Sequence, residues 1–248
     1  MTPQSPVAET DAIILCGGRG TRLGDVTAKT PKPLLPVGES PFLLRRLLAL
    51  RDEGVRRIIL STHVFAEQFD AFQREYADLF PELTIIREPE PLGTGGALRF
   101  AASAVRSPLC VAMNGDSWVE QPLAPLLTAH LARGRAFTMT VIRADRVEGD
   151  TRQKGLVMLG PHQEILGFST GTATSGWINA GLYVINTALL TQWPRDSYDV
   201  ERRFLALVPS SERYAFRSDG RLVDIGTPDV YARGETVLAS LPDVTRRP

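Results

Sequence analysis

Short apolar runs alternate with amphipathic stretches through the first half of the chain. The apolar runs suit single buried strands and fall at residues 12–16, 56–61, 83–88 and 108–116. Predicted helices between them cover residues 41–54, 65–79 and 95–105. In the first helix Phe42, Leu43, Leu47 and Leu50 share one face, and Gly54 ends it. Strands joined by helices of this length imply right-handed crossovers, so we expect a doubly wound, mostly parallel sheet with both faces covered.

The pattern changes from Phe137 onward. Apolar runs become short and rich in strand-forming residues, with glycine, proline or polar turns between them, at residues 137–144, 154–159, 164–169, 177–186 and 221–226. We expect these strands to form a β-rich lid over the carboxyl edge of the sheet. No break in composition marks a second unit, so residues 10–240 are predicted to form a single domain, between a disordered segment 1–9 and a frayed end 241–248.

Composition and charge narrow the functional classes. The 248 residues are 43% hydrophobic and 23% charged, as in an ordinary soluble globular protein. Lysine plus arginine and aspartate plus glutamate each number 28, so no global charge favours nucleic acid or a membrane surface. Cys16 and Cys110 lie inside apolar runs, where reduced, buried thiols are expected, and the first residues do not resemble a signal peptide. We therefore expect a cytoplasmic protein.

A glycine-rich loop follows the first predicted strand, in the stretch AIILCGGRGTRLG at residues 12–24. The dinucleotide fingerprint fails by one residue, because its last glycine position falls on Leu23, and the P-loop fails because no lysine follows these glycines. Glycines allow backbone N–H groups to approach phosphate oxygens closely, although such turns often only redirect the chain. Pro31 and Pro33 favour a binding loop, because they stiffen the backbone around Lys32 and fix where that cation points.

The two segments AIILCGGRGTRL and PKPLLPV together resemble the signature of the sugar-1-phosphate nucleotidyltransferases, the nucleoside-diphosphate-sugar pyrophosphorylases. Cys16 stands where the family usually has alanine. The resemblance extends from Ala12 to about Gly234. It implies a three-layer α/β/α sandwich with a Rossmann-like sheet and transfer of a nucleoside monophosphate from a triphosphate to a sugar 1-phosphate.

A second glycine cluster, EPEPLGTGGALRFA at residues 88–101, resembles the family segment that lines the nucleotide base. A helix start with free N–H groups also favours a polar or anionic ligand. Glu88 could accept two hydrogen bonds from the Watson–Crick edge of guanine, which favours GTP, although backbone groups could read the base instead. The predicted nucleotide-binding residues are Leu15, Gly17, Gly18, Gly20, Thr21, Arg22, Glu88, Gly93, Thr94 and Gly95.

Two aspartates are the predicted magnesium ligands. Asp116 follows a buried strand in VAMNGDSW, and Asp224 lies in RLVDIGTPDVYARG, which resembles the family's second aspartate segment. A hard cation prefers carboxylate oxygens and bridges phosphates. The resemblance further implies that Arg22 stabilises the transition state and the leaving pyrophosphate and that Lys32 holds charge near the attacked phosphorus, so the predicted catalytic residues are Arg22, Lys32 and Asp116.

The sugar end is predicted from three further segments. The resemblance implies that the sugar contacts are Asn114, Gly115, Asn179, Gly181 and Glu201. Many relatives carry a Glu-Lys pair where this chain has Thr170 and Gly171, so another basic residue replaces that lysine or the acceptor differs.

The segments together look most like D-glycero-α-D-manno-heptose 1-phosphate guanylyltransferases. Mannose-1-phosphate guanylyltransferases are the near alternative, and glucose-1-phosphate uridylyl- or thymidylyltransferases are more distant. A catalytically silent regulatory subunit of the same fold and a glycosyltransferase of related architecture are alternatives of another class. Relatives often form dimers or tetramers, so a homo-oligomer is a further expectation.

Overall fold

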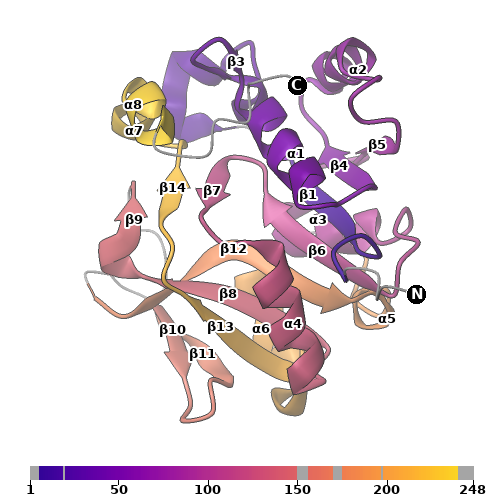
Figure 1. The fold of residues 1–248 in the computed structure, drawn as a ribbon, viewed down its shortest axis with the longest axis vertical. Helices are drawn as coiled ribbons and strands as arrows, with labels where there is room; N and C mark the ends of the chain where they lie inside the picture. Colours follow the sequence, from indigo (N-terminus) through magenta and orange to yellow (C-terminus); the bar gives the residue numbers. More distant parts are fainter. Residues whose placement is uncertain (1–5, 19, 150–155, 170–174, 197, 240–248) are drawn as a thin grey trace.

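The computed structural model describes residues 6–18, 20–149, 156–169, 175–196 and 198–239. Within these residues a nine-stranded sheet runs through the molecule (Figure 1). Seven strands follow the path β11-β10-β12-β6-β1-β4-β5. Strand β8 also pairs with β12, and β13 pairs with β8. Residues 6–9, which we expected in a disordered segment, form a turn in which Val7 is buried against the core. Thr10 closes that turn by donating its hydroxyl to the carbonyl of Pro6. The predictions for residues 1–5 and 241–248 lie outside the described residues.

The first half of the chain has the predicted alternation of strands and helices. The parallel strands are β1 (Asp11–Leu15), β4 (Ile58–Thr62), β5 (Leu83–Arg87) and β6 (Leu109–Asn114). The helices are α1 (Phe42–Asp52), α2 (Ala66–Glu75), α3 (Gly93–Ala101) and α4 (Leu123–Arg133). The strand ends of this half therefore meet along one edge of the sheet.

Both faces of the sheet are covered. Along β1, Ala12 and Ile14 pack into one core cluster with residues of α1, α2 and α4. Ile13 points to the other face and packs with residues of α3, α5 (Thr187–Leu190) and α6 (Val200–Leu207). This alternation, with buried positions on both sides of a strand, confirms the predicted three-layer sandwich.

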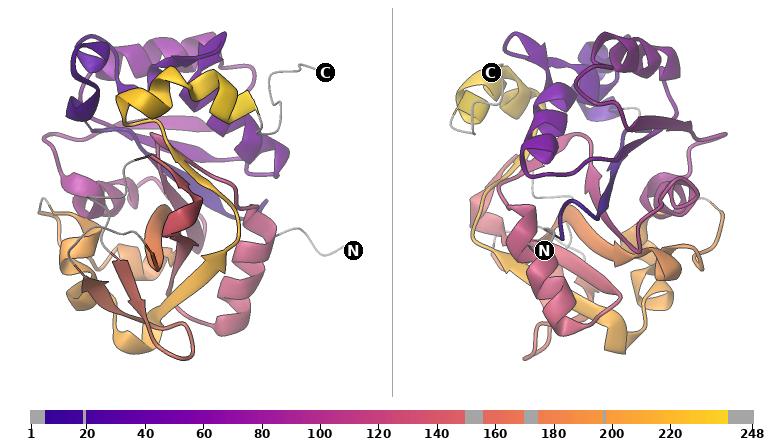
Figure 2. Two further views of the ribbon diagram at one scale, coloured as in Figure 1. Left: turned by 90° about the vertical axis from the view of Figure 1, so that its left-hand side faces the viewer. Right: turned by 45° about the vertical axis from the view of Figure 1, so that its right-hand side comes forward.

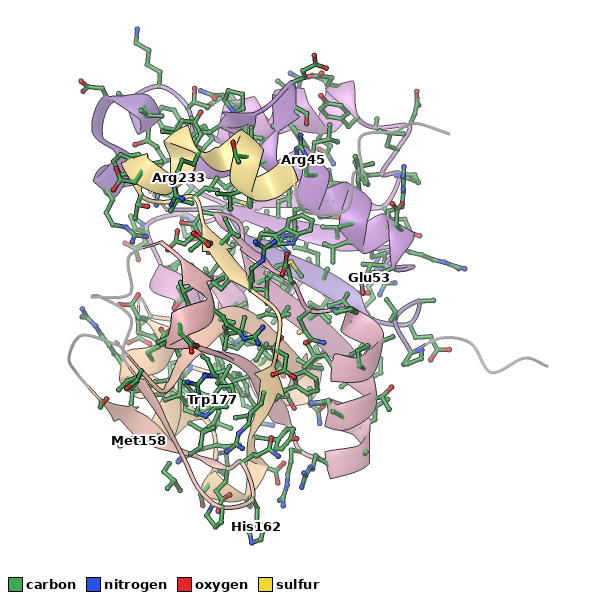
Figure 3. All side chains as sticks on the ribbon, turned by 60° about the vertical axis from the view of Figure 1, so that its left-hand side comes forward. Arg45, Glu53, Met158, His162, Trp177 and Arg233 are labelled. Atoms are coloured by element: carbon green, nitrogen blue, oxygen red, sulfur yellow. The ribbon has the colours of Figure 1, made fainter. Side chains whose placement is uncertain are left out.

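Most of the later strands extend the main sheet, whereas we expected them to form a lid; only the strand predicted at residues 221–226 lies in a separate sheet at the carboxyl edge. Strand β12 (Trp177–Asn186) pairs antiparallel with both β6 and β8 (Phe137–Arg143), and β13 (Arg213–Ser218) runs parallel to β8. The β10 (Leu156–Leu159) and β11 (Ile165–Ser169) hairpin joins the start of β12. Strand β12 therefore has a neighbour on each edge, and most of its residues are buried. In Figure 3, Met158 and His162 mark this hairpin at one end of the molecule, and Arg45 on α1 lies towards the other.

A second, three-stranded sheet completes the carboxyl edge. It contains β7 (Ser117–Val119), β14 (Leu222–Asp224) and β9 (Val147–Glu148). The C-terminal helices α7 (Pro228–Ala232) and α8 (Gly234–Ala239) lie beside the short strands β2 (Pro36–Val37) and β3 (Ser40–Pro41), as Figure 2 shows. Tyr231 donates its hydroxyl to the carbonyl of Pro36 at 3.1 Å. The remaining elements are the short helices η1 (Thr21–Thr27), η2 (Lys32–Leu34), η3 (Ala144–Arg146) and η4 (Ser210–Glu212).

Among the residues that the structure describes, no helix is both long and apolar enough to cross a membrane.

Candidate active site

A cleft of about 400 Å³ opens at the carboxyl edge of the parallel strands. Of the residues predicted from the sequence, it is lined by Leu15, Gly17, Gly18, Gly20, Lys32, Glu88, Gly93, Thr94, Asn114 and Asp116. The sequence reasoning missed the lining residues Cys16, Pro33, Pro91, Leu92, Ala97 and Asp199. Motif segments that are far apart in the chain therefore line one common cleft.

The glycine loop wraps closely around Lys32. Gly20 has a φ of 68°, and a β-carbon added there would lie 2.7 Å from Lys32 Cγ. Thr27 donates its hydroxyl to the Gly20 carbonyl at 3.0 Å, which fixes the far end of the loop. Because only glycine combines this backbone conformation with so close a contact, Gly20 is needed for the loop to close over the lysine. Arg19 lies outside the described residues, and Thr21 begins η1.

Glu88 is held in the cleft wall by internal donors. Ser61 donates its hydroxyl to Glu88 Oε1 at 2.8 Å, and the Leu92 N–H donates to Oε2 at 3.3 Å. Burial is the main influence on the pKa of Glu88 and raises it, whereas these two hydrogen bonds and the charge of His63 act to lower it. A β-carbon on Gly17 would lie 2.8 Å from Glu88 Oε1, so the carboxylate supports the glycine loop from behind.

Part of the start of α3 is covered by protein, whereas its first residues, Gly93 and Thr94, line the cleft. The N–H groups of Gly95 and Gly96 both point to the carbonyl of Tyr198, at 2.9 and 3.4 Å. A β-carbon on Gly95 would collide with the Tyr198 ring at 2.1 Å. Gly95 is therefore a packing position, because the carbonyl of Tyr198 already satisfies the donor that was predicted to face a ligand.

Gly93 and Thr94 join α3 to the segment before α6. Gly93 has a φ of 67°, and a β-carbon there would lie 2.6 Å from the Tyr198 carbonyl oxygen. The Thr94 hydroxyl accepts a hydrogen bond from the Val200 N–H at 2.9 Å. This junction brings Asp199, at the start of α6, to the cleft. No signal in the sequence marked Asp199, because its position depends on a contact between distant segments.

Pairing of β7 with β14 brings the two predicted magnesium ligands together. Ser117 is opposite Asp224 in the antiparallel register, and the Ile225 N–H donates to the Asp116 carbonyl at 3.2 Å. Asp224 is 2% exposed, and its Oδ1 accepts the Gly226 N–H at 2.9 Å. Asp224, the last residue of β14, thus lies beside the turn that carries Asp116, although their motifs are far apart in the chain.

A buried arginine supports this pair of strands. Arg46 of α1 donates to the Ser117 carbonyl, and its guanidinium carbon lies 4.5 Å from the centroid of the Trp118 ring. Burial lowers the pKa of Arg46 to about 10, and the charge of Glu53 opposes that shift. The guanidinium therefore stays charged at neutral pH and secures the turn that carries Asp116.

Each aspartate also faces a predicted catalytic cation. Lys32 Nζ lies 3.2 Å from Asp116 Oδ2, and Arg22 Nη2 lies 3.6 Å from Asp224 Oδ2. Gly226 lies where these groups meet, since a β-carbon there would be 2.7 to 2.9 Å from Asp224 Oδ1, Lys32 Nζ and Arg22 Nη2. The sequence reasoning missed Gly226, although the D-x-G-T-P segment contains it.

The predicted sugar contacts form a second cluster beside Asn114. Asn179 donates to Glu201 Oε1 at 2.6 Å, and its own Oδ1 accepts the Gly181 N–H at 2.9 Å. Gly181 has a φ of 68°, and a β-carbon there would lie 2.3 Å from Asn114 Nδ2. Asn179 and Glu201 do not line the described cleft itself, but they adjoin it through Gly181 and Asn114.

Gly115 and the segment at Thr170 and Gly171 were also considered for the sugar end. Gly115 is buried, and a β-carbon there would lie 2.7 Å from the Leu15 carbonyl and 3.0 Å from Cys16 Sγ. Its position is therefore explained by packing below the glycine loop. Thr170 and Gly171 lie outside the described residues.

The two carboxylates are suited to one divalent cation. Among the described residues, no group of three or more His, Cys, Asp and Glu side chains is placed to hold a metal by itself. Magnesium in nucleotide sites commonly uses one or two carboxylates and takes its other ligands from phosphates and water. Asp116 and Asp224, at the mouth of a glycine-lined cleft, match that donor set.

The glycine-lined cleft and its charged mouth lie at the carboxyl edge of an α/β sheet. A family model described as "Nucleotidyl transferase" matches residues 11–239. The chain therefore belongs to the nucleotidyl transferase family.

Individual relatives agree with this assignment. The mannose-1-phosphate guanylyltransferase of Mycobacterium tuberculosis (strain ATCC 25618 / H37Rv) is 31% identical over 236 residues, which cover 93% of this chain and 65% of that one. The D-glycero-alpha-D-manno-heptose 1-phosphate guanylyltransferase of Aneurinibacillus thermoaerophilus is 30% identical over 231 residues, covering 92% and 98%. The chain spans 63 to 65% of the length of several mannose-1-phosphate relatives.

A solved structure confirms the fold. The crystal structure of HddC from Yersinia pseudotuberculosis complexed with GMP-PN has a TM-score of 0.80 and 28% identity, and the match covers 92% of this chain and 99% of that one.

Proposed function

We propose that this chain transfers guanosine monophosphate from GTP to a sugar 1-phosphate, with release of pyrophosphate. The observation that carries the proposal is the meeting of Arg22, Lys32, Asp116 and Asp224 at the mouth of the cleft. This arrangement offers carboxylates for a divalent cation and cations for phosphate oxygens.

In the proposed reaction, an oxygen of the sugar 1-phosphate attacks the α-phosphorus of GTP. The bond between the α-phosphorus and the bridging oxygen to the β-phosphate breaks, and pyrophosphate leaves with those electrons. The protein contributes position and charge, because such a transfer needs little covalent work from it. Lys32 neutralises charge at the attacked phosphate, and Arg22 neutralises charge on the departing pyrophosphate. Asp116 and Asp224 would hold magnesium, which would supply positive charge to neutralise the phosphates.

The choice of GTP is supported by the two guanylyltransferases among the relatives and by the GMP-PN complex of HddC. Glu88 adds a chemical reason, because a carboxylate in the cleft wall accepts hydrogen bonds from both the N1–H and the exocyclic amine of guanine. ITP lacks that amine. The enzyme should therefore prefer GTP to ITP, and Glu88→Gln should reduce this preference by about tenfold. Asp199→Asn, which changes another carboxylate of the cleft, is the matched control.

Our first candidate for the acceptor is D-glycero-α-D-manno-heptose 1-phosphate, and mannose 1-phosphate is the second. Identity to relatives of these two specificities is almost equal, 30% and 31%, so the acceptor has to be measured directly. One experiment tests both parts of the proposal: GTP, ATP, UTP and dTTP are each combined with heptose, mannose and glucose 1-phosphates, and pyrophosphate is measured. We expect release with GTP and a manno-configured acceptor. Absence of pyrophosphate in every combination would instead favour a silent regulatory subunit, and a glycosyltransferase would likewise release none.

A further inference from the structure

Among the residues that the structure describes, four charged groups form two ion pairs at the mouth of the cleft. Lys32 is paired with Asp116, and Arg22 is paired with Asp224, at 3.2 and 3.6 Å. Two positive and two negative side chains therefore lie within one small region. Each pair joins a buried side chain, Lys32 (7% exposed) or Asp224 (2%), to one that is about a third exposed, so solvent screening is reduced at the buried members.

The set is also crowded, as the position of Gly226 demonstrates. The point that a β-carbon of residue 226 would occupy lies within 3 Å of Lys32 Nζ, Arg22 Nη2 and Asp224 Oδ1. Both cations thus occupy the space into which the Asp224 carboxylate points. A divalent ion on Asp116 and Asp224 would have to share that space with two positive charges.

Electrostatics then predicts how a divalent ion is accommodated. If Lys32 and Arg22 kept their places, the ion would meet two like charges at close range, which opposes its binding. A nucleoside triphosphate removes this obstacle, because its oxygens offer the two cations new partners while the carboxylates turn to the metal. Lys32 needs only a short movement, since it lines the cleft, and Arg22 Nη2 lies beside it at Gly226.

We propose that Lys32 and Arg22 act as internal counter-ions that weaken the binding of a free divalent ion, and that they exchange the aspartates for triphosphate oxygens as the metal–nucleotide complex binds. The inference rests on the proposed function, in that it assumes a metal-bound triphosphate as substrate. It assigns to the two cations a role before the chemical step, in addition to charge neutralisation during it.

The test is the affinity of the complete chain for Mn²⁺ alone, measured from the electron paramagnetic resonance signal of the free ion. Lys32→Met and Arg22→Met should each bind Mn²⁺ about tenfold more tightly than the wild type, because each removes one repelling charge. Arg22 is 36% exposed, so its variant should fold even if the buried Lys32→Met does not. Lys29→Met is the matched control, because it removes an exposed cation of the same loop and should leave Mn²⁺ affinity unchanged.

The same titration with α,β-methylene-GTP present should abolish the difference in Mn²⁺ affinity between the variants and the wild type. Wild-type affinity for Mn²⁺ should rise, and the advantage of the two variants should disappear, because they lack a cation for the phosphates. If both variants bind Mn²⁺ no more tightly than Lys29→Met, the exchange is wrong.

Failure of the exchange can be distinguished from failure of the proposed function. Pyrophosphate release by the wild type, with unchanged Mn²⁺ affinity in the variants, would overturn the exchange alone. Tighter Mn²⁺ binding in the variants without any pyrophosphate release would support the counter-ion role and overturn the guanylyl transfer. If Asp116→Asn and Asp224→Asn leave Mn²⁺ binding unchanged with and without nucleotide, the carboxylates are not its ligands and the exchange is also wrong.

Discussion

The proposed nucleotide end and the proposed sugar end of the site are built differently. At the nucleotide end, the glycine loop after β1 and the turn after β6 follow parallel strands, so each motif is already at the sheet edge when its strand is in place. The sugar end depends on Gly181, Asn179 and Glu201, which come from a bend in an antiparallel strand and from α6. Contiguous motifs therefore describe the nucleotide end well, whereas the sugar end depends on how distant segments pack.

Removing one carboxylate of the proposed metal pair should have the largest effect on activity, and this effect should not depend on the sugar. Asp116→Asn or Asp224→Asn is expected to lower kcat by about 10²-fold or more with every acceptor, because each variant loses a preorganised charge. Steady-state pyrophosphate release measures this. Asp145→Asn, which changes an exposed carboxylate paired with Arg143, is the control. Activity within a fewfold of the wild type in both site variants would contradict the assignment.

Gly226→Ala should have the next largest effect. The added methyl group would lie within 3 Å of Asp224, Lys32 and Arg22, so at least one of them must move. We expect kcat to fall by about tenfold or more, with little change in thermal unfolding, since the displaced groups surround the site. Gly134→Ala is a suitable comparison because nothing lies within 4 Å of that position. Its positive φ of 59° adds a backbone strain that residue 226 does not have, but its methyl group does not touch the charged groups. Equal kcat values for the two variants would rule out crowding at Gly226 as the cause.

A variant at the proposed sugar end should change the KM for the sugar 1-phosphate but not the KM for GTP. Glu201→Gln weakens the hydrogen bond from Asn179 and removes a charged acceptor for sugar hydroxyls. The KM for the sugar 1-phosphate is expected to rise about tenfold, while the KM for GTP changes less than twofold. Initial rates with each substrate varied in turn provide the measurement. A larger change in the KM for GTP would place Glu201 at the nucleotide end.

The smallest expected effect concerns stability and pH. Burial raises the pKa of Glu88 in the folded chain above its ordinary value of 4.5, so the folded state holds its proton to higher pH than the unfolded state does. The stability that this group contributes is present below about 4.5 and is lost as pH rises through the folded pKa. Glu88→Gln removes that titration, so its Tm relative to the wild type should increase between acidic and neutral pH. A difference in Tm that does not vary with pH would contradict this prediction.

Much of the fold and of the nucleotide end could be predicted from the sequence. Where a glycine turn or an Asn-Gly-Asp turn directly follows a strand, as at Gly17 and Asp116, the position of the strand also fixes the position of the functional residue. The covered start of α3 could not be predicted, because the carbonyl that satisfies the Gly95 N–H comes from Tyr198. Strand β13 was also missed. Its arginines give a charged pattern, and they are accommodated beside aromatic rings, with Arg217 lying 5.2 Å from the centroid of the Trp177 ring.

The pairing of Ser117 with Asp224 also has a consequence for the order of synthesis. The glycine loop and Asp116 are made early, but the second carboxylate and Gly226 emerge from the ribosome much later. A nascent chain that stops before residue 224 can form the parallel strands and the first half of the cleft, yet it lacks half of the proposed metal pair. Catalytic competence should therefore appear abruptly and late during translation, well after the nucleotide end has been synthesised.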